Sequence, residues 1–143
     1  MWILNPLMIV IAIFDQKVDP GLFVQWMGKL HPLVLHFPLV FGILISIYFI
    51  FFQDRRFHRD TEKLLLSINA LFASTAAIFG LFLSLQNAYE NDLINIHKWG
   101  GIAIALISWL FIYSLNFKDL IKRVLAVLFI LILVASTHKG AQL

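Results

Sequence analysis

Four long apolar segments, separated by short polar stretches, make up most of this chain. They cover Pro32–Phe52, Leu64–Leu85, Trp99–Phe117 and Leu120–Thr137. Each is roughly 18–22 residues long, and about 20 apolar residues suffice for an α-helix to cross the hydrocarbon core of a membrane. The pattern therefore predicts an all-α integral membrane protein, folded as a four-helix bundle.

The N-terminal part carries shorter apolar stretches. Trp2–Phe14 is apolar except for Asn5-Pro6, and at about 13 residues it is shorter than a typical span. It forms either a short spanning helix or an interfacial one, and the sequence leaves both open. After a loop at Asp15–Gly21, the mixed segment Leu22–Leu30 is typical of an interfacial helix. We therefore divide the chain into residues 1–29, with the short apolar and interfacial helices, and residues 30–143, with the membrane bundle.

Composition strengthens the membrane assignment. Of the 143 residues, 61% are hydrophobic and 13% are charged, and the mean hydropathy is +0.89. Soluble domains are nearer half apolar and a quarter charged. The net charge of +3 is small and suits basic loops at a lipid surface rather than nucleic-acid binding. The chain has no cysteine, which excludes disulfides, iron–sulfur clusters and covalent c-type haem.

The charges in the loops predict an orientation. The stretches Gln53–Lys63 and Asn116–Arg123 are rich in Lys and Arg, whereas Gln86–Asp92 contains neither. Basic loops stay in the cytoplasm, so we expect the C-terminus outside it. The N-terminus lies inside only if the first apolar stretch spans. Acidic residues are expected in the loops alone.

Four of the five histidines fall at the outer ends of the predicted spans: His31, His36, His97 and His138. Polar side chains kept in a membrane indicate a functional site by default. His58 lies in the basic cytoplasmic loop instead, where we expect a solvated residue. His31 and His36 differ by about 140° around a helix, so they should serve different partners.

Three chemistries suit these histidines. Two from different helices would ligate a b-type haem, three or four would bind zinc or copper, and a chain of them would relay protons. The relay ranks lowest, because no carboxylate is expected within the spans. For haem, we expect His36 and His97 as the first ligand pair, with His31 and His138 for a second haem or for supporting hydrogen bonds.

Two further features fit either haem or a simpler explanation, and for the second of them helix packing alone is the commoner one. Lys29, Lys98 and Lys139 flank the outer histidines, where they would contact haem propionates or lipid headgroups. Small residues allow close helix packing, and they also leave room for a porphyrin. They form one face of the second span and the start of the third: Ala73, Ala76, Ala77, Gly80, Ser84, Gly100 and Gly101.

Three motifs carry a resemblance to a known family. The stretch His31-Pro32-Leu33-Val34-Leu35-His36-Phe37-Pro38 resembles the double-histidine signature of the DUF2231 family of bacterial membrane proteins. His97-Lys98-Trp99-Gly100-Gly101 and the segment Thr137–Leu143 are similar to two further pieces of that family. The resemblance implies a membrane haem-type electron carrier in the bacterial cytoplasmic membrane, with His31, His36, His97 and His138 at its site. Ser136-Thr137 and Ala141 depart from the family pattern beside His138.

The leading interpretation is a b-type cytochrome with one or two haems, an electron-transfer protein rather than a stand-alone enzyme. Its partners would be other redox membrane subunits or an extracytoplasmic cytochrome, with quinol as a source of electrons. The alternatives are a cofactor-free accessory subunit of a respiratory complex and a histidine-rich zinc or copper site. We find no nucleophile–base set or phosphate-binding loop.

Overall fold

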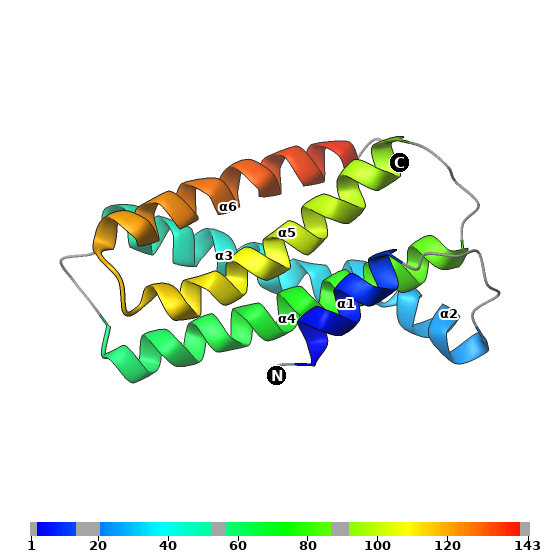
Figure 1. Cartoon of the computed structure of the whole chain (residues 1–143), viewed down its shortest axis with the longest axis horizontal. Helices are drawn as coiled ribbons and strands as arrows, with labels where there is room; N and C mark the ends of the chain where they lie inside the picture. Colours follow the sequence, from blue (N-terminus) through cyan, green and yellow to red (C-terminus); the bar gives the residue numbers. More distant parts are fainter. Residues whose placement is uncertain (1–2, 14–20, 53–56, 87–91, 141–143) are drawn as a thin grey trace.

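The computed structural model describes residues 3–13, 21–52, 57–86 and 92–140, without the side chains of 86, 92, 93, 139 and 140. This part of the chain is helical and contains no strand (Figure 1), which confirms the all-α prediction. Its helices are α1 (Leu4–Ile13), α2 (Leu22–Lys29), α3 (His31–Phe51), α4 (Arg59–Gln86), α5 (Asp92–Ser114) and α6 (Asp119–Gly140).

Four of these helices are long and apolar enough to cross a membrane: α3, α4, α5 and α6. Two begin earlier than predicted, α4 at Arg59 and α5 at Asp92, because polar residues continue each helix beyond its apolar run. Acidic side chains stabilise the first turn of a helix. Glu62 lies in the first turn of α4, where it is buried. The expectation that acidic residues are confined to loops is therefore wrong.

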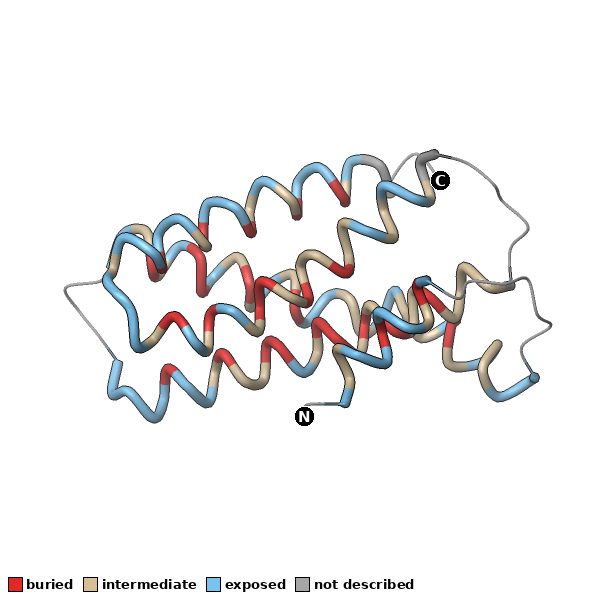
Figure 2. Tube along the Cα trace, in the orientation of Figure 1, coloured by how far each residue is buried: buried red, intermediate tan, exposed pale blue. Residues whose placement is uncertain are grey.

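The four long helices form an up-and-down bundle. Helix α3 packs against α4 and α6, and α5 packs against the same two helices, so α3 and α5 lie diagonally. The start of α4 and the turn between α5 and α6, which both carry basic residues, meet at one end of the bundle, where the Arg59 side chain donates to Oδ1 of Asn116. Phenylalanine rings fill the centre near that end: Phe49 stacks on Phe111 with centroids 5.5 Å apart, and Phe111 contacts Phe129. Buried residues follow the inner faces of the helices (Figure 2).

The short helices α1 and α2 pack against this bundle. Helix α1 has ten residues, or about 15 Å, which is half the thickness of a hydrocarbon core. It lies on α4 and α5, where the Trp109 indole N–H donates to Ser74 and the Ser74 hydroxyl donates to Asn5. Helix α2 packs mainly against α4. Its helical C-cap, Leu30, leads directly into α3 and makes His31 the first residue of that helix.

Candidate functional site

His31 is held against α4 by its own ring nitrogen. The Nδ1–H donates to the carbonyl oxygen of Ala76, at 2.8 Å. Gly80, one turn further along α4, leaves the space that the ring occupies, since a Cβ there would lie 3.0 Å from Cε1 and 3.1 Å from Nδ1. The small-residue face of α4 thus positions an imidazole at the start of α3.

His97 is held in the same way against α6. Its Nδ1–H donates to the carbonyl oxygen of Ser136 at 3.0 Å, and the Ser136 hydroxyl lies 3.4 Å from both Nδ1 and the His97 carbonyl oxygen. Gly100 permits this approach, because a Cβ on it would stand 2.7 Å from Cβ and Oγ of Ser136. The adjacent Gly101 has no such role, since a Cβ on it would meet nothing within 4 Å.

These two hydrogen bonds define the tautomer of each ring. A carbonyl oxygen only accepts, so each Nδ1 must carry the proton, and in a neutral imidazole the other nitrogen is then an acceptor. No hydrogen bond within the described residues uses Nε2 of His31 or His97. Both rings thus keep a lone pair for a ligand, and backbone carbonyls orient ligating histidines in this manner.

The two rings lie close together across the diagonal of the bundle. Their centroids are 6.4 Å apart, and the ring planes are nearly perpendicular, at 83°. A cavity of about 260 Å³ opens beside them, lined by both histidines and by Ala77, Gly80, Lys98 and Gly101 among others. A smaller cavity of about 40 Å³ also touches both rings and reaches Pro38 and Ile104.

The other three histidines do not join this pair. His36 is exposed, and its Nδ1–H donates to the Pro32 carbonyl of its own helix at 2.5 Å. His138 is exposed near the end of α6, and His58 lies at the other end of the bundle, 3.6 Å from Asp60. The structure therefore brings His31, and not the expected His36, beside His97. Within the described ranges, no three His, Cys, Asp or Glu side chains are close enough to hold a metal ion.

The flanking lysines take different positions. Lys98 lines the larger cavity, and its Nζ lies 5.8 Å from the centre of the Trp99 ring, within cation–π range. Lys29 is exposed in the last turn of α2, two residues before His31. The side chain of Lys139 lies outside the described residues. Of the lysines whose side chains the structure describes near the histidines, Lys98 lines the candidate site.

Sequence reasoning missed the groups that orient the two rings. Ser136 is, by sequence, only a departure from a motif, yet its carbonyl fixes the tautomer of His97. The available signal is its place one residue before the predicted end of the last span. Also missed is a buried polar contact deeper in the bundle, where the Asn69 amide donates to the Ser108 hydroxyl at 3.2 Å.

No protein-family model, curated protein or solved structure matches this chain. The resemblance to the DUF2231 family thus stays a prediction that depends on the quoted motifs.

Proposed function

We propose that this protein is a membrane electron-transfer protein that binds a b-type haem between His31 and His97. The observation that carries the proposal is the 6.4 Å separation of two rings whose Nδ1 atoms both donate to backbone carbonyls. Haem proteins of this kind ligate the iron through imidazole nitrogens on facing helices.

The separation can be compared with the length of two metal–imidazole bonds in a line. A metal–nitrogen bond of about 2.0 Å and roughly 1.15 Å from that nitrogen to the ring centre place two ligating rings about 6.3 Å apart. The observed centroid separation of 6.4 Å would suit such a pair with both Nε2 atoms turned toward the metal. A perpendicular arrangement of the rings is compatible with it, because each ring can turn about its own metal–nitrogen bond.

Two features of the cavity suit a bound haem, and one does not. Ala77, Gly80 and Gly101 carry little bulk on the cavity wall, and Lys98 would pair with a propionate. A cavity of about 260 Å³, however, is smaller than a whole porphyrin. Haem binding thus requires α4 and α5 to separate there. A bound haem would supply one-electron redox chemistry, while His31 and His97 would ligate the iron and Lys98 would hold a propionate.

The cavity size also favours a second candidate, a single copper ion between the same two nitrogens. Imidazole is a good copper ligand, whereas structural zinc needs four ligands and this pair supplies two. A cofactor-free accessory subunit of a respiratory complex is the third possibility. Elemental analysis and a visible spectrum of the purified protein separate the three.

The decisive experiment is the spectrum of the reduced, purified protein and its alanine variants. Since both ligands are needed for six-coordinate iron, H31A and H97A should each lose the sharp α band while remaining helical. H36A and H58A are the matched controls and should keep it, because neither ring lines the cavity. Retention of a full six-coordinate spectrum in both H31A and H97A contradicts the pairing. Absence of haem and copper from the unmodified protein would leave the accessory role.

The setting we propose is the bacterial cytoplasmic membrane, with the histidine end outside the cytoplasm. Support comes from the basic turns, which meet at the opposite end of the bundle through Arg59 and Asn116. Redox partners would then be other membrane subunits or an extracytoplasmic cytochrome at the histidine end.

A further inference from the structure

Helix α1 lies along the seam between α4 and α5, on the outside of the four-helix bundle. Two of its residues, Met8 and Ala12, are buried. They share one apolar cluster with side chains of both neighbouring helices, namely Ala73, Ile78 and Leu81 of α4 and Ile102 and Ala105 of α5. One short helix therefore packs against both walls of the seam.

A pair of hydrogen bonds connects the three helices near the start of α1. The Trp109 indole N–H of α5 donates to the Ser74 hydroxyl of α4 at 2.8 Å. That hydroxyl in turn donates to Oδ1 of Asn5 on α1, at 3.1 Å. Because Ser74 is fully buried, water does not compete for these bonds. A single hydroxyl thus joins α1, α4 and α5.

From this contact, α1 continues to the level of the histidine cavity. Helices α1 and α4 run in the same direction (Figure 1). Seven residues after the contact between Asn5 and Ser74, or about 10 Å further along, Ala12 is therefore about level with Leu81. Leu81 lines the cavity of about 260 Å³, and so does Gly101 on α5. Helix α1 thus flanks the seam beside the place where a porphyrin requires α4 and α5 to separate.

The lipid around α1 makes its attachment easy to release. Its outer face is apolar, with Leu7 43% and Val10 51% exposed, and Asn5 is the one polar side chain of the helix. Lipid tails are as apolar as leucine, so packing and hydrogen bonds, rather than the hydrophobic effect, hold helices together in a membrane. The attachment of α1 therefore depends on the fit of Met8 and on the Ser74 hydroxyl.

We propose that α1 is a strap that keeps α4 and α5 together beside the histidine pair, and that its release opens the seam to a bulky ligand. The cavity would then widen between Leu81 and Gly101, which face each other across the seam from α4 and α5. The purpose of the opening, admission of a haem-sized ligand, rests on the proposed function. The movement itself can be measured without haem.

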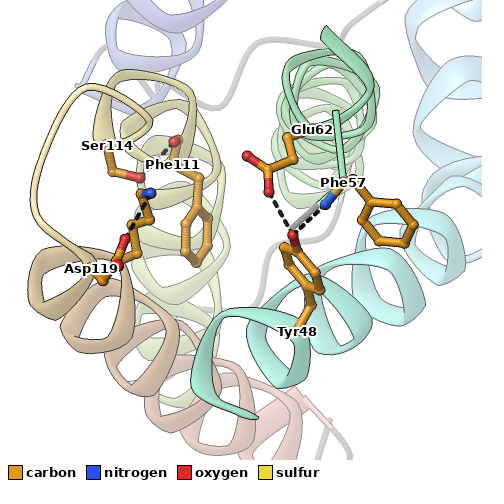
Figure 3. A network of polar contacts seen from close by, with 7 residues as sticks. Tyr48, Phe57, Glu62, Phe111, Ser114 and Asp119 are labelled. Atoms are coloured by element: carbon orange, nitrogen blue, oxygen red, sulfur yellow. Dashed lines mark hydrogen bonds and ion pairs between the residues drawn. The ribbon is translucent and has the colours of Figure 1, made fainter. Parts of the chain in front are cut away.

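Cysteine labelling measures this movement, because the chain has no cysteine of its own. G101C places a thiol on the cavity wall, where a Cβ meets nothing within 4 Å. S114C places one near the other end of α5, where the buried Ser114 hydroxyl donates to the Phe111 carbonyl at 2.7 Å (Figure 3). Each thiol is reacted with fluorescein-5-maleimide, a bulky reagent, in purified full-length protein in detergent micelles, and the labelling rate is measured.

The first comparison removes the shared hydroxyl. S74A should speed the labelling of G101C at least about fivefold, since α1 loses its hydrogen bond to α4. S108A is the matched control: Ser108 is equally buried, and its loss removes a hydrogen bond from Asn69 between α4 and α5 but none to α1. S108A should change the labelling rate of G101C less than about twofold, and S74A should change that of S114C equally little.

The second comparison changes the packing of α1 and decides the matter even where S74A fails to fold. M8A removes the buried side chain and should speed the labelling of G101C, whereas L7A, on the outer face, should leave the rate within about twofold. The proposal is overturned if S74A labels no faster than S108A, if M8A labels no faster than L7A, or if S114C is accelerated as much as G101C. Haem content of H31A and H97A tests the proposed function alone, so the two proposals can fail separately.

Discussion

The contact between Gly100 and Ser136 offers a sharp test of how the site is built. In G100A the new Cβ would stand 2.7 Å from both Cβ and Oγ of Ser136. Carbon atoms pack best at about 3.5–4.0 Å, so α5 and α6 must move apart by roughly 1 Å. That displacement would break the 3.0 Å hydrogen bond from His97 to the Ser136 carbonyl. A methyl group on α5 should therefore both destabilise the bundle and loosen the ring.

The neighbouring Gly101 provides a control that isolates the energetic cost of the clash in G100A. In G101A the Cβ meets nothing within 4 Å, so this variant gains only the helix preference of alanine, about 1 kcal/mol. G100A gains the same preference but adds overpacking, which costs about 1–3 kcal/mol. The free energy of unfolding should thus be lower in G100A than in G101A by about 1–3 kcal/mol.

The assay is equilibrium unfolding in mixed micelles, followed by far-ultraviolet circular dichroism on preparations with matched cofactor content. The double variant G100A/S136G removes the clashing atoms and leaves only the Ser136 Cα, at 3.6 Å, which is ordinary contact. A double-mutant cycle with S136G should then give a favourable coupling of about 1–2 kcal/mol. Equal stability of G100A and G101A, or a coupling near zero, would refute the argument that Gly100 sets the approach of α6.

Two further predictions concern the core and the orientation. G42A should lower the free energy of unfolding by about 1–3 kcal/mol in the same assay, because its Cβ would collide with the ring of Phe129, which is fully buried; F129L in the same chain should recover part of the loss, and an unchanged stability would contradict the packing. A reporter fused after Leu143 should be active only in an extracytoplasmic assay, as the basic turns predict, and cytoplasmic activity would reverse the orientation.

The sequence predicts the long helices well because their signal is strong and local. Each apolar run has spanning length, and the structure contains four helices that match them. The helix ends are predicted less well, since the apolar run of the second span begins only at Leu64 while the helix itself begins at Arg59. Backbone hydrogen bonding continues through polar residues at an interface, so hydropathy alone underestimates helix length.

The histidine pairing shows where local reasoning fails. The offset between His31 and His36 correctly implies that they occupy different faces, but it does not say which face points inward. That depends on how α2 continues into α3 through Leu30 and on the space left by Gly80. Both are tertiary features. Helices α3 and α5 lie diagonally in the bundle, and their histidine-bearing ends converge, so that His97 has a partner on α3.

The remaining polar groups of the bundle indicate where binding energy is still available. Several are paired: the Trp109 indole N–H with Ser74, the Ser74 hydroxyl with Asn5, and the Asn69 amide N–H with Ser108. Two buried atoms, Ser46 Oγ and Asn69 Oδ1, have no hydrogen-bond partner among the described residues. In hydrocarbon an unpaired polar group costs free energy that water would otherwise recover. The Nε2 atoms of His31 and His97 make no hydrogen bond among the described residues, although the two rings lie beside each other. A ligand that satisfies both would regain that cost at once, which is why the pair, rather than any single histidine, carries the functional argument.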